Sequence, residues 1–403
     1  MTAKVTAGER LRYEFDKIRD ASNAEVARVV GGDEVQLVLA DNLISRIVVH
    51  SSRQSGLSGV YQELLDFDGS EIYTIEQPAL TGKTFADAVL GYDKSTLIGL
   101  CDANHCVRIN PAMDLVVAAG ERAILIAEDD DQIAFTGAPA AGLVDEAAIR
   151  PAVAEDSRAE RTLILGWNRR GPIIARELAR YMAPGSLLTV GADLPGLAEE
   201  IAGLELPDDA MAIEFRPMDT SSASELRALD VPSYDHVIVL GYSDHLAAQP
   251  ADTRTLVALL HLRKIAEDSG AHINIVSEMA DIRNRELAEV TRADDFVVSN
   301  KLVSLMLAQA SENDRIASIF DELLDEEGSE IYMRPLADYV DLTRPLSFYT
   351  IAESARRRGQ VALGYRRIRN EGKDRLGGVV LNPTKSEQLS FEPADRLVVL
   401  ARD

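Results

Sequence analysis

ELLDFDGSEIY, at residues 63–73, occurs again as ELLDEEGSEIY at residues 322–332, with nine of eleven positions identical. Apolar residues before and at the start of both copies recur at the same offsets and at helical spacing, which predicts the same apolar helix face in each copy. The two sets are Leu57, Val60, Tyr61, Leu64 and Leu65, and Ile316, Ile319, Phe320, Leu323 and Leu324. A repeated helix and turn this far apart indicate an internal duplication.

The repeat extends outward on both sides of this stretch. An earlier helix is predicted before each copy, NLISRIVVHSS at 42–52 and KLVSLMLAQAS at 301–311. A short apolar strand precedes each of those helices, VQLVLA from Val35 and DFVVS from Asp295. Gly69 and Gly328 are expected to end the second helix of each copy in a left-handed turn. The residues Ile-Tyr that follow would open a strand.

Three strands are predicted after each copy, in the same order. The first set is STLIGL, VRINP and ERAILIAE, and the second is QVALGYRR, GVVLNP and DRLVVLAR. Both copies therefore predict a small β-lobe behind a pair of helices. Residues 135–160, between the copies, are rich in Ala, Pro, Gly and acidic residues and are typical of a linker.

A nucleotide-binding type of fold is predicted from RTLILGWNRRGPIIARELARYM, residues 161–182. A buried strand over 162–165 leads into a tight turn at 166–171, and Pro172 opens a helix. Strands LLTVGAD, MAIEFR, HVIVLG, INIVSE and DFVVS follow, alternating with helices. This alternation predicts an α/β fold with a Rossmann-like, doubly wound parallel sheet of six strands.

The candidate binding residues lie at the carboxyl edge of this sheet. The turn keeps Gly166 and Gly171 of the G-x-G-x-x-G pattern, but Asn168 replaces the glycine that lets a pyrophosphate approach. Arg169 and Arg170 follow at a helix N-terminus, a position that suits an anion. Two interpretations stay open: binding of NAD or another nucleotide, or a structural turn with two solvated arginines.

Two aspartates extend this candidate site. Asp193, 22 residues past Gly171, stands where an acidic residue meets a ribose hydroxyl. Asp219, after the third strand, is a weaker candidate on the same edge.

No catalytic residue is predicted. The six histidines fall in no base–nucleophile pattern. Cys101, His105 and Cys106 provide only three zinc ligands across a predicted hairpin, so zinc is disfavoured. The acidic run at 128–131 is expected to be a solvated loop, with a calcium site as the alternative.

Charge and hydropathy limit the partners. A net charge of -24 argues against nucleic acid as a partner. No apolar run approaches the roughly 18 residues of a membrane span, and the N-terminus has no signal-peptide core, which favours a cytoplasmic protein.

Taken together, these motifs resemble a known family. The turn GWNRRG, the repeated ELLDxxGSEIY helices and the lobe ALTGKTFADAV…TLIGL…VRINPAMDLVVAAGERAILIAEDDD look like the CASTOR/POLLUX group of ion channels in their bacterial form. In that family a membrane pore precedes two tandem RCK (regulator of K+ conductance) domains, and four chains form a cytosolic gating ring. The resemblance implies a homo-oligomer, expected to be a tetramer, at the inner face of the membrane. It also implies a nucleotide or Ca2+ as the ligand.

The resemblance divides the chain into seven segments, with a truncated first unit and no pore. They are 1–40, an N-terminal remnant with the end of the first Rossmann lobe; 41–75, the first helical crossover; 76–134, the first RCK C-lobe; 135–160, the linker; 161–300, the second Rossmann lobe; 301–331, the second crossover; and 332–403, the second C-lobe. The strand from Val35 would lack its sheet, so we expect it to pair across a subunit interface or to be disordered.

These observations predict a cytosolic regulatory module of a cation channel, without enzymatic activity. One alternative is an NAD-binding RCK subunit that docks on a separate potassium transporter, because this chain contains no pore. The other is a Rossmann oxidoreductase, which would need a proton-transfer residue that the sequence does not offer.

Overall fold

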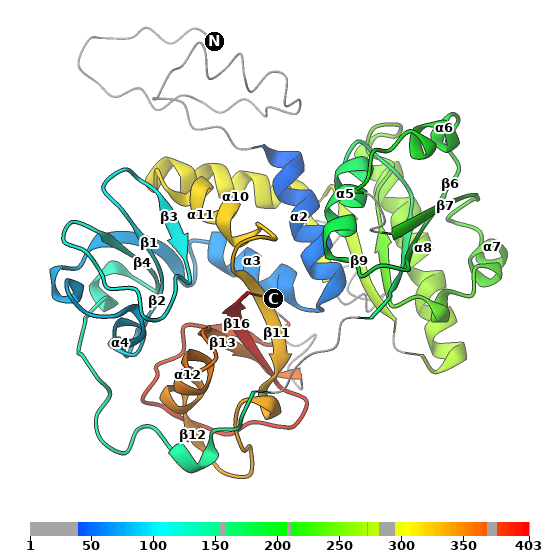
Figure 1. Ribbon diagram of the computed structural model, residues 1–403. Helices are drawn as coiled ribbons and strands as arrows, with labels where there is room; N and C mark the ends of the chain where they lie inside the picture. The colour runs from blue at the N-terminus through cyan, green and yellow to red at the C-terminus, as the bar shows by residue number, and fades with distance from the viewer. Residues whose placement is uncertain are drawn as a thin grey trace, which may run out of the picture.

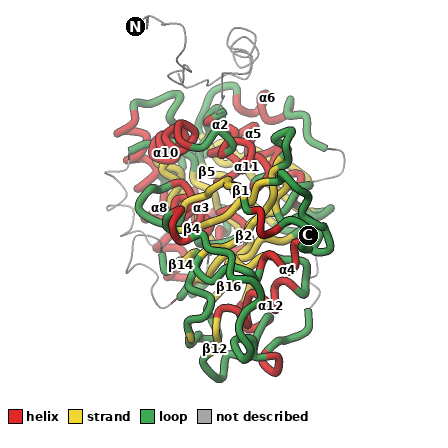
Figure 2. Tube along the Cα trace, turned by 90° about the vertical axis from the view of Figure 1, so that its left-hand side faces the viewer, coloured by secondary structure: helices red, strands yellow, loops and turns green. Residues whose placement is uncertain are grey.

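Three lobes surround a central group of helices in the computed structural model (Figure 1). The structure describes residues 39–152, 158–207, 211–271, 273–281, 295–368 and 377–402. The molecule is elongated, with helices α2 (Ala40–Arg53) and α10 (Ser299–Glu312) towards one end and strand β12 (Leu346–Ser347) at the other (Figure 2). The strand expected from Val35 lies outside the described residues, except for its last two, and Ala40 already belongs to α2.

The Rossmann-like lobe has the predicted sheet of six parallel strands, in the order β10-β9-β8-β5-β6-β7. The strands are β5 (Arg161–Leu165), β6 (Ser186–Ala192), β7 (Met211–Pro217), β8 (His236–Val239), β9 (Asn274–Met279) and β10 (Asp295–Val298). From central β5 the chain continues to β6 on one side and later to β8 on the other. The doubly wound topology is thereby confirmed.

Helices cover both faces of this sheet. Residues such as Leu163 and Val237 face α7 (Ala223–Ala228) and α8 (Ala248–Ser269). The alternate residues, such as Ile164 and Ile238, share a core with α5 (Gly171–Tyr181) and α2. Helix α2 comes from the first repeat, so the first repeat completes the core of the second Rossmann lobe.

The two β-lobes have the same topology, as the sequence repeat predicts. Their four-stranded sheets have the orders β1-β4-β2-β3 and β11-β16-β13-β14, with antiparallel neighbours. The first sheet contains β1 (Glu71–Glu76), β2 (Ser95–Cys101), β3 (Val107–Ile109) and β4 (Arg122–Ala127), and the second β11 (Glu330–Pro335), β13 (Val361–Arg366), β14 (Val379–Leu381) and β16 (Arg396–Ala401). We call them the first and second C-lobes.

Local irregularities repeat as well. The pairing register shifts between Leu97 and Gly99 in β2 and between Ala362 and Gly364 in β13. A Cβ atom on Gly99 would lie 2.4 Å from the Arg108 carbonyl oxygen, and one on Gly364 would lie 2.1 Å from that of Val380. Glycine is therefore required where the neighbouring strand passes over each bulge.

Each C-lobe also contacts the other through an equivalent asparagine at positive φ. Asn110 donates from Nδ2 to the Gly359 carbonyl oxygen at 3.0 Å, and Asn382 donates to that of Lys94 at 2.8 Å. The two lobes thus form a pseudo-symmetric pair within one chain.

The helices of each repeat pack on the C-lobe of the other. Helix α3 (Leu57–Leu65) contacts β14, and helix α11 (Ile316–Leu323) contacts β3. All four helices α2, α3, α10 and α11 share one hydrophobic core with both sheets. We call these four the crossover helices.

The expected left-handed turns at Gly69 and Gly328 are wrong, because neither glycine has a positive φ. Helix α3 ends at Leu65 on the extended residue Asp66, well before the glycine. A Cβ on Gly69 would meet only the end of the Glu63 side chain, whereas one on Gly328 would lie 3.0 Å from the Glu322 carbonyl oxygen.

Part of the segment predicted as a linker, 135–160, lies against the second C-lobe. Ile149 forms a β-bridge with Val340, Arg150 N donates to the Tyr339 carbonyl oxygen at 2.9 Å, and Ala148 is buried there.

Candidate functional site

The turn after β5 is shaped by glycine, as the sequence predicts. Gly166 has φ +84°, and a Cβ atom there would lie 2.2 Å from the Leu240 carbonyl oxygen. A Cβ on Gly171 would lie 2.5 Å from the Trp167 ring, which packs against the start of α5. Both glycines are therefore needed for the close approach of strand, turn and helix.

Asn168 fills the centre of this turn and uses its whole carboxamide. Its Nδ2 donates to the Gly241 carbonyl oxygen at 2.8 Å and to Glu278 Oε2 at 3.0 Å, and its Oδ1 accepts from Arg170 N at 3.0 Å. The residue is 2% exposed and has no positive φ. Its side chain therefore stabilises the turn through hydrogen bonds. Asparagine tolerates positive φ better than most residues, but the turn does not use this property.

Three consecutive backbone donors at the start of α5, those of residues 169–171, have acceptors within the chain. Arg169 N donates to Asp244 Oδ2 at 2.6 Å, and Gly171 N donates to the Asn168 carbonyl oxygen at 2.8 Å. With Arg170 N on Asn168 Oδ1, three of the N–H groups at this helix start are engaged. A nucleotide phosphate would have to displace one of these acceptors.

Carboxylates engage both arginines of the turn; Arg170 is buried, whereas the Arg169 side chain is also exposed to solvent. Arg169 Nε lies 2.6 Å from Asp41 Oδ2, and its Nη1 lies 2.6 Å from Asp244 Oδ1. Arg170, 4% exposed, donates from Nη1 to Asp41 Oδ1 at 2.9 Å and from Nη2 to Glu278. Of these acids, Asp41 belongs to α2, Asp244 follows β8 and Glu278 is on β9.

The charge state of Asp41 follows from this pairing. Burial raises the pKa of its carboxyl group, but hydrogen bonds and charges from Arg169 and Arg170 outweigh burial and hold this pKa below its ordinary value. Asp41 is therefore an ionised acceptor at neutral pH. Arg170 Nε is buried with no hydrogen-bond partner among the described residues.

Asp193 and Asp219 follow β6 and β7, so they lie at the carboxyl edge shared with Gly166. Asp193 is exposed. Asp219 accepts from Ser221 N at 2.9 Å and from Arg254 Nη2 at 3.0 Å, and the Arg254 guanidinium lies 4.2 Å from the centre of the Tyr242 ring. Hydrogen bonds from Ser221 and the charge of Arg254 lower the pKa of Asp219.

Sequence reasoning missed Asp41, Asp244 and Glu278. Glu278 ends the predicted strand INIVSE, so its place at the carboxyl edge of the sheet could have been inferred. Asp41 gave no such indication, because it lies in the other repeat.

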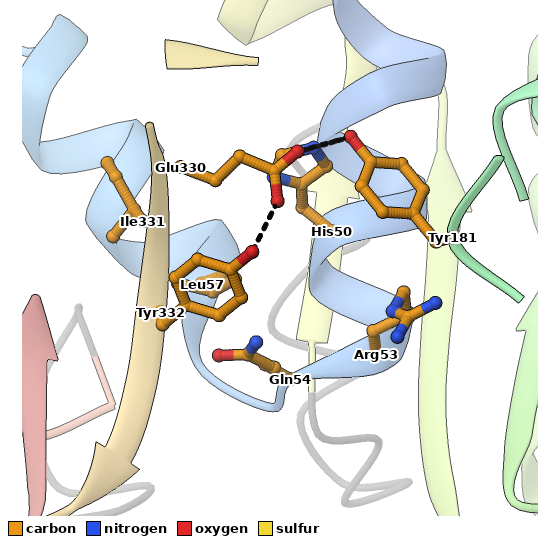
Figure 3. Close-up of a pocket in the computed structure, with 8 residues that line it drawn as sticks. All are labelled: His50, Arg53, Gln54, Leu57, Tyr181, Glu330, Ile331 and Tyr332. Carbon is orange, nitrogen blue, oxygen red and sulfur yellow. Dashed lines mark hydrogen bonds and ion pairs between the residues drawn. The ribbon is translucent and has the colours of Figure 1, made fainter. Parts of the chain in front are cut away.

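A second polar cluster connects the two repeats at the far end of α2 (Figure 3). Tyr61 Oη lies 2.8 Å from His50 Nδ1, His50 Nε2 lies 3.2 Å from Tyr181 Oη, and Tyr181 donates to Glu330. Glu330 also accepts from Tyr332 at 3.0 Å. Because Tyr181 donates its hydroxyl proton to Glu330, its oxygen can only accept from His50. The ring proton of His50 is therefore on Nε2, and Nδ1 accepts from the Tyr61 hydroxyl.

The other repeat has the equivalent contact with a different residue. Gln309, at the position of His50 in α10, donates to Glu71 of β1 at 3.3 Å. Likewise Gln54 accepts from Met333 N, and Asn313 donates to the Ile72 carbonyl oxygen at 3.0 Å. Strand β11 of the second repeat is thus held by residues at the end of α2, and strand β1 of the first repeat by residues at the end of α10.

Two hollows adjoin these contacts. The one beside His50, Tyr181 and Glu330 has about 20 Å³, enough for one water molecule. The other has about 390 Å³ and lies between the C-lobes, with Glu63, Asp68, Glu128, Lys94 and Asn382 among its lining residues.

Neither hollow nor the acidic run is arranged as a metal site. Within the described residues, no group of three or more His, Cys, Asp or Glu side chains could hold a metal ion. Of the cysteine pair, Cys101 is buried and Cys106 is exposed. No helix of the described parts is both long and apolar enough to cross a membrane.

Comparison with known proteins gives concordant matches. Residues 41–140 match a family model described as Castor and Pollux, part of voltage-gated ion channel. The chain is 27% identical over 422 residues to the probable ion channel CASTOR of Oryza sativa subsp. japonica, covering 95% of this chain and 46% of that protein. It is 28% identical to the probable ion channel POLLUX of Arabidopsis thaliana, covering 95% and 50%. The chain therefore spans about half the length of these relatives.

A solved structure shares the fold. The human SLO3 gating ring superposes with a TM-score of 0.69 at 14% identity, covering 95% of this chain and 80% of that one. Nearly the whole chain is thus similar to a stretch that makes up about half the length of each of these CASTOR and POLLUX ion channels, as its motifs predicted, and it shares the fold of the SLO3 gating ring.

Proposed function

We propose that this chain is a regulatory module of a CASTOR/POLLUX-type cation channel, which senses a ligand and transmits a conformational change to an ion-conducting pore. The observation that carries this proposal is the position of α2. Its N-terminal Asp41 contacts the turn of the Rossmann-like lobe. At its other end, His50 lies 3.7 Å from Glu330 of β11, and Gln54, the residue after the helix, accepts from Met333 N of β11. At about 1.5 Å per residue, the distance along the helix is roughly 14 Å from Asp41 to His50 and roughly 20 Å to Gln54.

A rigid helix that joins two lobes can couple them. A ligand that changes the contact at Asp41 would shift α2, and the shift would reach β11 through Tyr181, Glu330 and Gln54. The equivalent α10 contacts β1 through Gln309, so both C-lobes would respond. This is the arrangement that a module needs for passing a local binding event to a larger assembly.

The ligand site that we propose is the carboxyl edge of the parallel sheet. Gly166, Asn168 and Gly171 would form its floor, and Asp193 and Asp219 would face the ribose of NAD or another nucleotide. Since relatives of this chain are named as ion channels, we infer regulation and not catalysis. We further propose that the module works as a homo-oligomer, with four copies by family resemblance, at the inner face of a membrane.

Light scattering combined with hydrogen exchange tests this function. The purified chain would be measured alone and with NAD, ADP or calcium. We expect a multimer, and slower or faster amide exchange in β11 with one of these ligands. A monomer whose exchange is the same under all four conditions would contradict the proposal.

The alternative of a subunit docked on a separate potassium transporter predicts co-purification of a membrane protein with the tagged chain. An oxidoreductase would instead transfer hydride to a test substrate when NADH is added.

A further inference from the structure

The two arginines at the N-terminus of α5 already hold an anion, the Asp41 carboxylate of this protein. Both oxygens of Asp41 are engaged there: Oδ2 by Arg169 Nε at 2.6 Å, and Oδ1 by Arg170 Nη1 at 2.9 Å and Arg169 Nη2 at 3.3 Å. A carboxylate between two arginines at a helix start occupies the kind of position in which proteins bind phosphate.

We propose that the first turn of α2 and a phosphate-bearing ligand compete for Arg169 and Arg170, so that binding of the ligand releases Asp41. This inference rests on the proposed ligand site at the same sheet edge. It goes further by naming the contact that must break and the helix that must move.

The local charges explain why the two cannot bind together. Two arginines face three carboxylates, Asp41, Asp244 and Glu278, so the cluster carries an excess of one negative charge. A phosphate added to this cluster would be repelled. If Asp41 leaves, two arginines face two carboxylates, so no excess negative charge is left to oppose a phosphate.

The donors favour a phosphate over a second carboxylate. Arg170 Nε is buried without a partner among the described residues, while both oxygens of Asp41 are already engaged. A phosphate offers more oxygens than a carboxylate and can satisfy this additional donor.

The same cluster reaches both pairs of crossover helices. Glu278 accepts from Asn168 and Arg170 in the turn, and also from Ser299, the first residue of α10, at 2.7 Å. Exchange of Asp41 for a ligand therefore changes the surroundings of the N-terminal ends of α2 and α10 at once.

Calorimetry on the full chain tests the competition, with inorganic pyrophosphate as the probe. We expect Asp41→Asn, which keeps the shape and removes the charge, to bind pyrophosphate at least tenfold more tightly than the wild type. Glu177→Gln is the matched control: Glu177 pairs with Arg46 of α2 at 3.7 Å but lies away from the turn. Its affinity should equal that of the wild type. Equal affinity of Asp41→Asn and the wild type, or no binding by either, would overturn the proposal.

Hydrogen exchange of the wild type decides the question even if Asp41→Asn does not fold. Saturating pyrophosphate should speed exchange in the first two turns of α2. Binding with unchanged exchange there would contradict competition. Faster exchange in α2 without a change in β11 would support the competition but contradict the proposed coupling of α2 to β11. Failure of the competition and failure of the proposed function are therefore distinguishable. Tighter binding of ADP than of pyrophosphate would identify a nucleotide, and equal binding a free phosphate.

Discussion

At the scale of single residues, two bases that are buried where the repeats meet, His50 and Lys385, have pKa values well below the ordinary ones. His50 is 6% exposed, and burial, together with the charges of Arg53 and Arg46, lowers its pKa to about 3. Its Nε2 lies 3.7 Å from Glu330 Oε1, a distance at which a protonated ring would form an ion pair. We favour the neutral ring, because tyrosine hydroxyls already satisfy both nitrogens and the cost of burying the charge is larger.

The first prediction concerns the pH dependence that His50 causes. Unfolded His50 binds a proton below about pH 6.5, whereas the folded form stays neutral to about pH 3. This contribution to the free energy of unfolding is therefore present above pH 6.5 and decreases as the pH falls, by about 1.4 kcal/mol per unit. The variant His50→Gln has the residue found at the equivalent position 309. Between pH 6.5 and 5, its free energy of unfolding should fall by roughly 2 kcal/mol less than that of the wild type. Urea denaturation at both pH values measures this, and equal losses in both proteins would contradict it.

Lys385 gives the second prediction. It is 1% exposed and donates to the Ser95 carbonyl oxygen at 2.5 Å, and burial lowers its pKa to about 7, although the charge of Asp93 opposes this shift. Between pH 7 and roughly 10 the unfolded chain holds a proton that the folded chain lacks, so stability from this group increases with pH. The variant Lys385→Met has the residue found at the equivalent position of the first repeat, Met113. In denaturation curves, its free energy of unfolding should increase by about 2 kcal/mol less between pH 7 and 8.5 than that of the wild type. An unchanged gain would show that Lys385 keeps its proton.

At the scale of elements, the strands depend on two glycines at equivalent bulges. We predict that Gly99→Ala and Gly364→Ala each lower the free energy of unfolding by at least about 2 kcal/mol, since a new methyl group would meet a backbone carbonyl that cannot move away alone. Gly241→Ala is the control, because its nearest neighbour would be 3.9 Å away. It should change stability by less than about 1 kcal/mol. Comparable effects at all three positions would refute the steric explanation.

The elements themselves were predictable, and their long-range contacts were not. Helix periodicity located all four crossover helices, and runs such as TLIL and HVIV gave the parallel strands, because burial on one or both faces leaves a pattern in the sequence. The turns at Gly69 and Gly328 were misinterpreted, since glycine in a sequence does not reveal φ, and neither residue has a positive φ. Asp41 and Arg170, from different repeats, meet only through the tertiary fold.

At the scale of the whole molecule, one core joins both C-lobes to the crossover helices. We therefore predict that the C-lobes unfold together. His50→Ala and Gln309→Ala each remove a contact to one C-lobe, at Glu330 and Glu71, and each should lower the opening free energy of amides in both sheets by about 1 kcal/mol. Native-state hydrogen exchange measures this. An effect confined to the contacted sheet would mean that the lobes open separately.

Covalent linkage of the two repeats has a consequence for how such a molecule can evolve. In a dimer of identical chains, one codon change alters both symmetry-related contacts, so a histidine could not arise at one without the other. Here His50 and Gln309 are encoded separately, as are Lys385 and Met113. Selection can therefore give one interface an ionisable group and leave its counterpart neutral, which lets two halves of common ancestry respond to different signals.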